Sequence, residues 1–329
     1  MNPEKPLFSI IICTKNREKH LSLCLDSILL DLAQSLIGSY EIIIVGGIEE
    51  KSAGIISNVL KKYEIMPGNL HYIMQDRTGL PNARNCGLRK AHGKIIVFFD
   101  DDVVVNTGYF NELDRIFSSE KRTGGVSGVY QKSLNLYPRM AMLKISTDRL
   151  FLGGCSGENG PIGKVLQSGF TTSNFEYADK LTEVNRLTGC NMAFSEHAIK
   201  KRFFDENYVG GVGIGEDADY SYRVEKAGFS LFVDPKLQIM HEDVEDKFFP
   251  YSECHLYYFA LNHTYFFFKE VYDAKANSLV HFVIGSIYYS FLHLVGSTAC
   301  SRPSIGFSFL RGLLSGLHHS RAIIEVSNK

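Results

Sequence analysis

The chain has 329 residues, 45% hydrophobic and 22% charged, which is long enough for one large domain or for a domain with an appendage. Its 35 basic and 36 acidic residues nearly cancel, so charge gives no reason to expect nucleic acid as a partner. Seven scattered cysteines without a Cys-x-x-Cys pair favour a reducing compartment, and residues 1–17 resemble neither a signal peptide nor a membrane span, so we expect a cytosolic protein.

The first hundred residues alternate between apolar β-branched runs and segments of helical period. The runs predict strands at 7–13, 41–45, 70–74 and 94–99. Apolar residues spaced from Leu21 to Leu32 predict a helix, and a second helix is expected to start near Pro81 and to stop at Gly93. This alternation predicts an α/β fold with a parallel sheet covered by helices on both faces. In such folds the ligand site lies outside the carboxyl ends of the strands.

The rest of the chain divides into two regions of different character. Residues 120–245 are richer in glycine and loops, with regular structure expected at 187–194 and 216–233 and a helix closing at Gly228. Residues 246–329 are aromatic and apolar, and the only full charges between 278 and 324 are Arg302, Arg311 and Arg321. We therefore predict one domain over 1–245 and a helical C-terminal region over 246–329.

Three adjacent carboxylates, Asp100, Asp101 and Asp102, follow the fourth predicted strand. Mg²⁺ and Mn²⁺ prefer oxygen ligands and usually take one or two protein carboxylates together with phosphate oxygens of a substrate. An Asp-x-Asp sequence at a strand end suits that role. A solvated turn or a helix cap is the alternative, because many folds place acidic residues at strand ends.

Two later motifs add to this acidic signal. Glu216 and Asp217 open a predicted helix, where negative side chains are favoured, so capping explains them without any function. A carboxylate in a cleft can instead take the proton from an attacking hydroxyl. His241 ends the strand that follows, and it is either structural or a third ligand of a metal site.

Four stretches together resemble the successive motifs of family 2 glycosyltransferases. They read FSIIICTKNR, GLPNARNCGLRKAHGKIIVFFDDD, LTGCNMAFSEHAIKKRFFDE and GEDADYSYRVEKAGFSLFVDPKLQIMHE, and the match runs from about Leu7 to Asp243. The resemblance implies the GT-A fold, a parallel-rich mixed sheet flanked by helices. It also implies an inverting transferase that uses a nucleotide-sugar donor and a divalent metal, Mn²⁺ or Mg²⁺.

The resemblance also implies how the donor is held. Thr14 and Arg17 would lie beside the nucleotide base, and Arg84 near the donor. Asp100 would bind the ribose, and Asp101 would belong to the same donor site. Arg84 has a second explanation, because it could form a structural ion pair.

The reacting groups follow in the same way. Asp102 and His241 would hold the metal, Asp217 would be the base, and Glu216 would support it. The segment expected to face sugar and acceptor is Gly189, Cys190 and Asn191. Its glycine could instead serve only to let two backbones approach.

One departure from the family pattern concerns the second strand. The family usually ends this strand with VDDGS, whereas this chain has VGGIEE, so the Asp expected near the nucleobase is replaced at Gly46 and Gly47. Glu49 or Glu50 could substitute for it. The departure leaves the donor base open.

We therefore predict an enzyme that moves a sugar from a nucleotide-sugar to a hydroxyl of a glycan or lipid-linked acceptor, in assembly of a bacterial-type surface polysaccharide or glycolipid. A nucleotidyltransferase could use a similar sheet, but the glycine-rich loop expected after its first strand is replaced here by CTKNREKH. A glycoside hydrolase would need two carboxylates and no metal-held diphosphate. An inert membrane-associated scaffold of a polysaccharide assembly complex is the alternative outside enzymes.

The C-terminal region predicts contact with a membrane. Residues 278–299 are about long enough to span a bilayer, yet His281, His293 and several glycine and serine residues favour a helix that lies on the surface. Arginines without neighbouring acids suit anionic headgroups. We expect peripheral attachment through 278–324 to the cytoplasmic face. A helical cap on the catalytic domain and a dimer interface are the alternatives.

Overall fold

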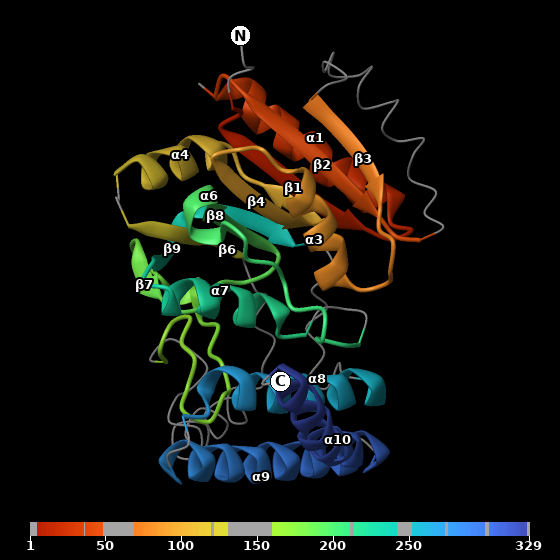
Figure 1. The fold of residues 1–329 in the computed structure, drawn as a ribbon. Helices are drawn as coiled ribbons and strands as arrows, with labels where there is room; N and C mark the ends of the chain where they lie inside the picture. Colours follow the sequence, from red (N-terminus) through yellow and green to blue (C-terminus); the bar gives the residue numbers. More distant parts are fainter. Residues whose placement is uncertain are drawn as a thin grey trace. The chain divides into compact units, whose positions relative to one another are not determined.

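The computed structural model forms two compact units, and each is assembled from three stretches of chain (Figure 1). The first unit comprises Met1–Lys132, Ala178–Glu206 and Tyr220–Val244, and the second comprises Ser133–Tyr177, Asn207–Asp219 and Glu245–Lys329. The residues that the structure describes are 5–35, 37–48, 69–119, 122–130, 160–210, 214–241, 252–273, 276–299 and 303–327. The domain boundary predicted at 245 stays a prediction.

The first unit is built on a nine-stranded sheet with the order β3-β2-β1-β4-β8-β6-β9-β5, in which β7 also pairs with β9. Its first four strands pair in parallel and confirm the four predicted runs. They are β1 (Phe8–Thr14), β2 (Tyr40–Gly46), β3 (Leu70–Met74) and β4 (Ile95–Asp100). Strands β1, β2 and β4 are almost wholly buried, as strands covered on both faces should be.

Alternation along β1 assigns the covering helices to the two faces of the sheet. Phe8, Ile10 and Ile12 belong to one core cluster with the apolar residues of α1 (Glu18–Gln34) and α4 (Tyr109–Ser119). Ile11 points to the opposite face, where a Cβ on Gly87 of α3 (Leu80–Lys90) would lie 2.5 Å from Ile11 Cγ2. The expectation of helices on both faces is confirmed. The residues that would connect β2 to β3, 49–68, lie outside the described part.

The later strands make the sheet mixed. Strand β8 lies antiparallel between β4 and β6, and β9 pairs in parallel with β6 and antiparallel with β5 and β7. These elements are β5 (Val103–Val105), β6 (Thr123–Tyr130), β7 (Thr182–Val184), β8 (Asn191–Ser195), β9 (Ser230–His241) and the short helix α6 (Glu196–Ile199). Strands β8 and β9 confirm the regular structure expected within 187–194 and 216–233.

Two glycines named from the sequence play different parts. Helix α7 (Glu216–Lys226) ends near Gly228, whose φ of +91° is the left-handed conformation predicted for it. The prediction for Gly93 was wrong, because α3 ends at Lys90 and its C-cap is Ala91. A Cβ on Gly93 would lie 2.5 Å from the backbone nitrogen of Ser9, so this glycine lets the chain run close to β1.

The C-terminal part of the second unit is helical, as predicted. It contains α8 (Glu253–Phe266), the π-helical turn η3 (Phe267–Val271), α9 (Ala276–Ala299) and α10 (Pro303–Ser327), with the 3-10 turn η2 (Phe175–Tyr177) earlier in the chain. A Cβ on Gly312 would lie 2.2 Å from the carbonyl oxygen of Tyr257, and one on Gly316 would lie 2.6 Å from Thr264 Cβ. These two glycines therefore allow α10 to approach α8 closely.

Candidate active site

The acidic triplet lies at the carboxyl end of the central strands. Asp100 is the last residue of β4 and is opposite Cys13 in the parallel register with β1. Asp101 and Asp102 form a turn into β5, whose first residue, Val103, pairs with His241 at the end of β9. Strand pairing thus brings together residues that are far apart in the sequence. This is the edge at which ligands bind to open α/β sheets.

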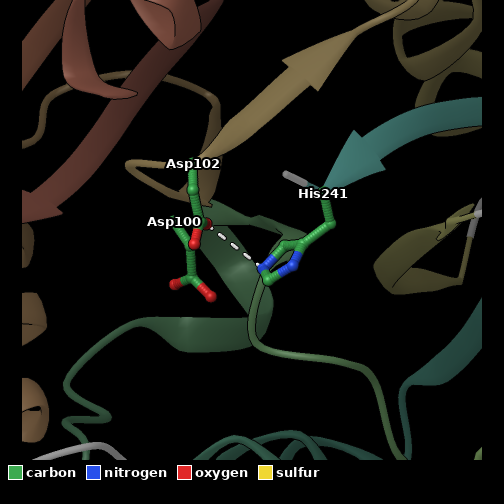
Figure 2. A group of neighbouring side chains, drawn as sticks. All are labelled: Asp100, Asp102 and His241. Carbon is green, nitrogen blue, oxygen red and sulfur yellow. Dashed lines mark ion pairs between the residues drawn. The ribbon is translucent and has the colours of Figure 1, made fainter. Parts of the chain in front are cut away.

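Asp100, Asp102 and His241 form a cluster that could hold a metal ion. Each offers one ligand atom, and these atoms lie within 4.8 Å of one another (Figure 2). His241 Nε2 lies 3.2 Å from Asp102 Oδ1. The set of two carboxylates and one imidazole suits Mn²⁺, and carboxylates are the protein ligands that Mg²⁺ prefers. The sequence assigned Asp102 and His241 to the metal, whereas it placed Asp100 at the ribose.

Two buried polar atoms in this cluster fit a cation. Asp102 is 4% exposed, and its Oδ1 has no hydrogen-bond partner among the described residues. His241 Nδ1 is also buried without such a partner in that part of the chain. A buried polar atom without a hydrogen bond is costly. Coordination of a cation by Asp102 Oδ1 would offset the cost of burying this atom without a hydrogen bond. The residues present therefore fit a divalent metal.

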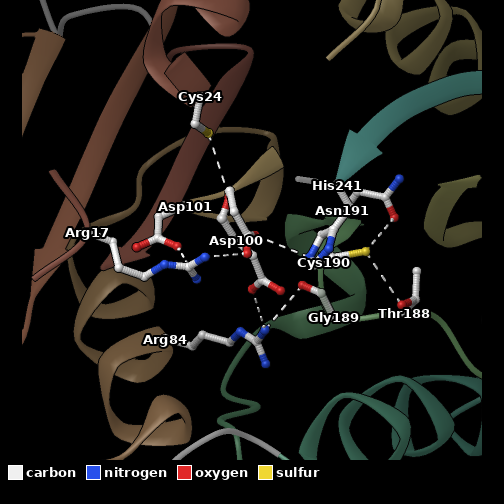
Figure 3. A network of polar contacts seen from close by, with 11 residues as sticks. Arg17, Cys24, Arg84, Asp100, Asp101, Thr188, Gly189, Cys190, Asn191 and His241 are labelled. Atoms are coloured by element: carbon white, nitrogen blue, oxygen red, sulfur yellow. Dashed lines mark hydrogen bonds and ion pairs between the residues drawn. The ribbon is translucent and has the colours of Figure 1, made fainter. Parts of the chain in front are cut away.

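Two arginines offset part of the charge of the triplet (Figure 3). Arg17, just before α1, places Nη1 3.0 Å from Asp101 Oδ1 and Nη2 2.8 Å from Asp102 Oδ2. Arg84, on α3 and only 3% exposed, places Nη2 3.3 Å from Asp100 Oδ1. Three carboxylates therefore face two guanidinium groups, and the remaining negative charge favours a cation. Arg84 does form the ion pair foreseen for it, and its role towards a donor stays a prediction.

Asp101 is as deeply buried as Asp102. Burial raises its pKa to about 6, although the Thr14 hydroxyl and the Arg17 guanidinium both act to lower it. Thr14 donates a hydrogen bond to Asp101 Oδ2 at 2.7 Å. Thr14, Arg17 and Asp101 thus lie together beside the cluster. Their predicted contacts with a nucleotide stay predictions.

The segment expected to face sugar and acceptor is joined to the triplet through its backbone. Arg84 Nη2 donates a hydrogen bond to the carbonyl oxygen of Gly189 at 3.1 Å. The backbone N–H of Asp100 donates one to the carbonyl oxygen of Cys190 at 3.2 Å. Asn191 is wholly buried and accepts a hydrogen bond from the Ser127 hydroxyl at 2.9 Å. Contact of this segment with a substrate stays a prediction.

Glu216 and Asp217 belong to the second unit, where they begin α7. Asp217 Oδ1 accepts a hydrogen bond from the backbone N–H of Ala218 at 2.8 Å, which agrees with the capping explanation. Glu216 is 2% exposed, whereas Asp217 is only partly buried. The structure therefore places these residues where the sequence predicted a helix start, and their catalytic role stays a prediction.

Sequence reasoning missed a cavity of about 950 Å³ beyond the end of β1. It is lined by Lys15–His20, Ile48 and Thr78. The signal was present, because the sequence KNREKH places four basic residues within six positions directly after the strand. Gly47, where the family pattern has an acid, lies under the Lys15 side chain, since a Cβ there would be 3.1 Å from Lys15 Cγ. The proposed substitutes Glu49 and Glu50 lie outside the described residues.

Comparison with known proteins agrees with this architecture. The family model described as "Glycosyl transferase family 2" matches residues 9–196. The minor teichoic acid biosynthesis protein GgaB of Bacillus subtilis is 25% identical over 241 residues, which cover 68% of this chain and 23% of GgaB. The putative glycosyltransferase EpsH of the same organism is 29% identical over 117 residues, which cover 36% of this chain and 32% of EpsH. The chain thus spans about a quarter to a third of these relatives.

Solved structures share the fold at low identity. The mannosyltransferase PcManGT from Pyrobaculum calidifontis, in complex with GDP-Man and Mn²⁺, matches with a TM-score of 0.53 and 15% identity over 97% of this chain and 88% of that one. S. aureus TarS matches with a TM-score of 0.55 and 15% identity, over 95% of this chain and 49% of that one. These likenesses confirm the expected GT-A fold. The family match over more than half of the chain shows that it belongs to family 2 of the glycosyltransferases.

Proposed function

We propose that the protein transfers a sugar from a nucleotide-sugar to a hydroxyl acceptor, with inversion at the anomeric carbon, in assembly of a cell-surface polysaccharide or glycolipid. The observation that carries this proposal is the cluster of Asp100, Asp102 and His241 at the carboxyl edge of a family 2 sheet. PcManGT, which shares the fold, forms a complex with GDP-Man and Mn²⁺, and this supports a metal-held nucleotide-sugar here.

In this proposal the first unit binds the donor. Asp102 and His241 hold a divalent cation, with Asp100 beside them. When bound, such a cation stabilises the negative charge that grows on the departing diphosphate. Arg17 orients Asp102 through its ion pair, and Arg84 orients Asp100. The basic cavity beyond β1 offers Lys15, Lys19 and His20 to the negatively charged nucleotide.

Asp217 supplies the proton acceptor. It takes a proton from the acceptor hydroxyl, whose oxygen then displaces the diphosphate from the anomeric carbon in a single step. One displacement inverts that centre. Glu216, the buried residue before it, contacts the acceptor or orients the base. The support is the position of both residues in the first turn of α7 and the partial exposure of Asp217 alone.

The acceptor class is supported by the names of the relatives. GgaB is named for teichoic acid biosynthesis. A Methanococcus voltae relative, 26% identical over 59% of this chain and 62% of its own length, is named as a glucuronosyltransferase acting on a dolichyl N-acetylglucosaminyl phosphate. A lipid-linked or polymeric glycan with a free hydroxyl is therefore the acceptor that we propose.

A donor panel tests the function. The purified protein is incubated with Mn²⁺ and a panel of UDP-glucose, UDP-N-acetylglucosamine, UDP-N-acetylgalactosamine, GDP-mannose and dTDP-rhamnose, with and without lipid-linked acceptors. We expect release of a nucleoside diphosphate together with a glycosylated product of inverted configuration, detected by NMR. Conversion of a nucleotide-sugar and added pyrophosphate into a nucleoside triphosphate and a sugar 1-phosphate would instead identify a nucleotidyltransferase. Absence of turnover with every donor would support the scaffold alternative.

Attachment to a membrane is part of this proposal. Helix α9 contains Asn277–Val295, the one stretch in the described residues that is long and apolar enough to cross a bilayer, and 33% of it is buried. Apolar side chains remain exposed along α9 and α10, namely Leu279, Val280, Val283, Ile284, Ile287, Phe291, Leu294, Val295, Phe307, Leu310, Leu314 and Leu317. Residues 276–324 contain no Asp or Glu, and Arg311 is exposed on α10. An apolar surface with an exposed cation fits an anionic lipid headgroup layer.

We expect the protein to bind vesicles that contain phosphatidylglycerol more tightly than vesicles of phosphatidylcholine alone, because its exposed cations meet anionic headgroups. Combining Ile287→Glu with Leu314→Glu should abolish sedimentation with either vesicle, and Leu30→Glu, which changes an exposed leucine of α1, should not. Release of the membrane-bound protein by alkaline carbonate would distinguish attachment from a spanning helix. Protein that stays soluble with both vesicles would contradict the membrane contact.

A further inference from the structure

The acidic turn that opens α7 is held in place by the C-terminal helices of the second unit. This turn contains Glu216, Asp217 and Asp219. Within residues 216–219, Glu216, Ala218 and Asp219 are at most 4% exposed, and only Asp217 is partly exposed. Each residue of a helix is rotated by about 100° from the one before it, so Asp217 and Asp219 point in directions about 160° apart, on nearly opposite sides of the helix. Whatever fixes Asp219 in the interior therefore directs Asp217 away from it.

Lys269 forms an ion pair with Asp219 and also lies 3.7 Å from Glu270 Oε1. Its Nζ lies 2.6 Å from Asp219 Oδ1, and the Asp219 side chain is wholly buried. A buried carboxylate requires an opposite charge or hydrogen bonds, because it has lost its hydration. The Lys269 ammonium also lies 5.7 Å from the ring centroids of both Tyr208 and Tyr265, within range of a cation–π interaction. One cation thus links the turn to the loop before it and to α8.

The loop that leads into α7 is held by a second residue of α8. Asn262, 1% exposed, donates hydrogen bonds to the carbonyl oxygens of Val209 at 2.8 Å and Ile214 at 3.0 Å. Gly215 then takes a φ of +93°, which favours glycine, and its carbonyl accepts the first helical hydrogen bond from Asp219 at 3.0 Å. Asn262 therefore holds the loop from which the helix begins, and Lys269 contacts the first turn of that helix.

Lys269 lies in a π-helical turn, which is uncommon in proteins and is found frequently at functional sites. The backbone N–H of Tyr272 donates to the carbonyl oxygen of Phe267 at 2.8 Å, the five-residue spacing of a π-helix. The wider turn gives Lys269 a direction that a continued α-helix of α8 would not give.

We propose that Lys269 is a positioning residue for the catalytic turn: through its ion pair with Asp219 it fixes the rotation of α7 that presents Asp217 to the acceptor. This inference rests on the proposed role of Asp217 as base. It makes α8 and η3 part of the catalytic apparatus, in addition to any contact of α9 and α10 with a membrane.

The test compares Lys269→Met with Lys226→Met, the same change at an exposed lysine at the other end of α7. Lys269→Met should lower kcat by about 10²-fold, which is the loss expected for a small displacement of a reacting group. The KM for the donor that the panel identifies should stay unchanged. Hydrogen exchange measured by mass spectrometry should become faster in 214–219, a readout that needs no substrate. Lys226→Met should change neither quantity. Lys269→Arg keeps the charge and should recover most of kcat.

A double variant separates positioning from simple stability. Lys269→Met combined with Asp219→Asn removes the buried negative charge that has lost its ion pair with Lys269, so the melting temperature should recover while kcat stays low. Recovery of kcat together with the melting temperature would show a merely structural pair and overturn the inference. Unchanged hydrogen exchange in 214–219 of the Lys269→Met variant would also overturn it. If Asp217→Asn loses transfer and Lys269→Met does not, the inference about Lys269 is wrong and the proposed role of Asp217 stands. If Asp217→Asn transfers normally, both proposals are wrong.

Discussion

Asp217→Asn should reduce sugar transfer by about 10²–10⁴-fold, the usual contribution of a general base. Asparagine caps helices as well as aspartate does, and its side-chain oxygen can still accept from the N–H of Ala218. The variant should therefore keep its melting temperature within a few degrees, and it should bind Mn²⁺ and donor as the parent does. Single-turnover measurement of the chemical step is the direct assay.

Two further variants serve as comparisons for Asp217→Asn. Glu216→Gln should reduce the rate less, because this residue is assigned to acceptor contact or orientation rather than to proton removal. Glu253→Gln changes an exposed acid in the first turn of α8 and should leave the rate unchanged. Transfer by Asp217→Asn at near the parental rate, with donor and acceptor confirmed, would restore capping as the explanation of the motif.

Removal of the divalent metal should abolish transfer, and Asp102→Ala should lower the affinity of the protein for that metal. EDTA is expected to stop the reaction, and added Mn²⁺ or Mg²⁺ to restore it. Loss of Asp102 should cost at least about 10²-fold in metal affinity, the upper end of the loss seen for residues that only support a ligand. Calorimetric titration of Mn²⁺ measures this without any substrate.

The control for this carboxylate is Asp179→Ala, an exposed acid of the first unit. Its Mn²⁺ affinity and donor affinity should equal those of the parent, whereas Asp102→Ala should lose both. Full activity of the parent in EDTA would contradict the metal assignment. Equal Mn²⁺ affinity in the parent and in Asp102→Ala would assign the ion to other ligands.

The sheet was predictable where strands are covered on both faces. Strands β1, β2 and β4 are continuous apolar runs, so length and β-branched content identify them without any partner. Strand β7 carries no such signal, and β5 is a run of three valines that is too short to identify a strand by itself. Their structure depends on pairing with β9, which a local pattern cannot show.

The candidate site was predictable in its residue types and less so in its contacts. Asp102 and His241 were assigned together from motifs, but their proximity depends on the pairing of Val103 with His241. The ion pairs of Arg17 with the triplet also went unforeseen, because a loop residue has no register that fixes its direction. Lys269 carried no motif, since its part depends on a π-helical turn.

The interleaved connectivity of the second unit sets a condition on biosynthesis. The stretch Asn207–Asp219 belongs to this unit, but its partner Asn262 lies 53 residues further along the chain than Val209. At about 5–20 residues per second, the ribosome needs about 3–10 s to synthesise that interval. During this interval the nascent chain already contains β1 to β4 with the acidic triplet, but not the helix that holds the start of α7. His241, which completes the metal cluster, is made later in this interval and still before Asn262, so every residue of that cluster is synthesised before the residue that holds the start of α7.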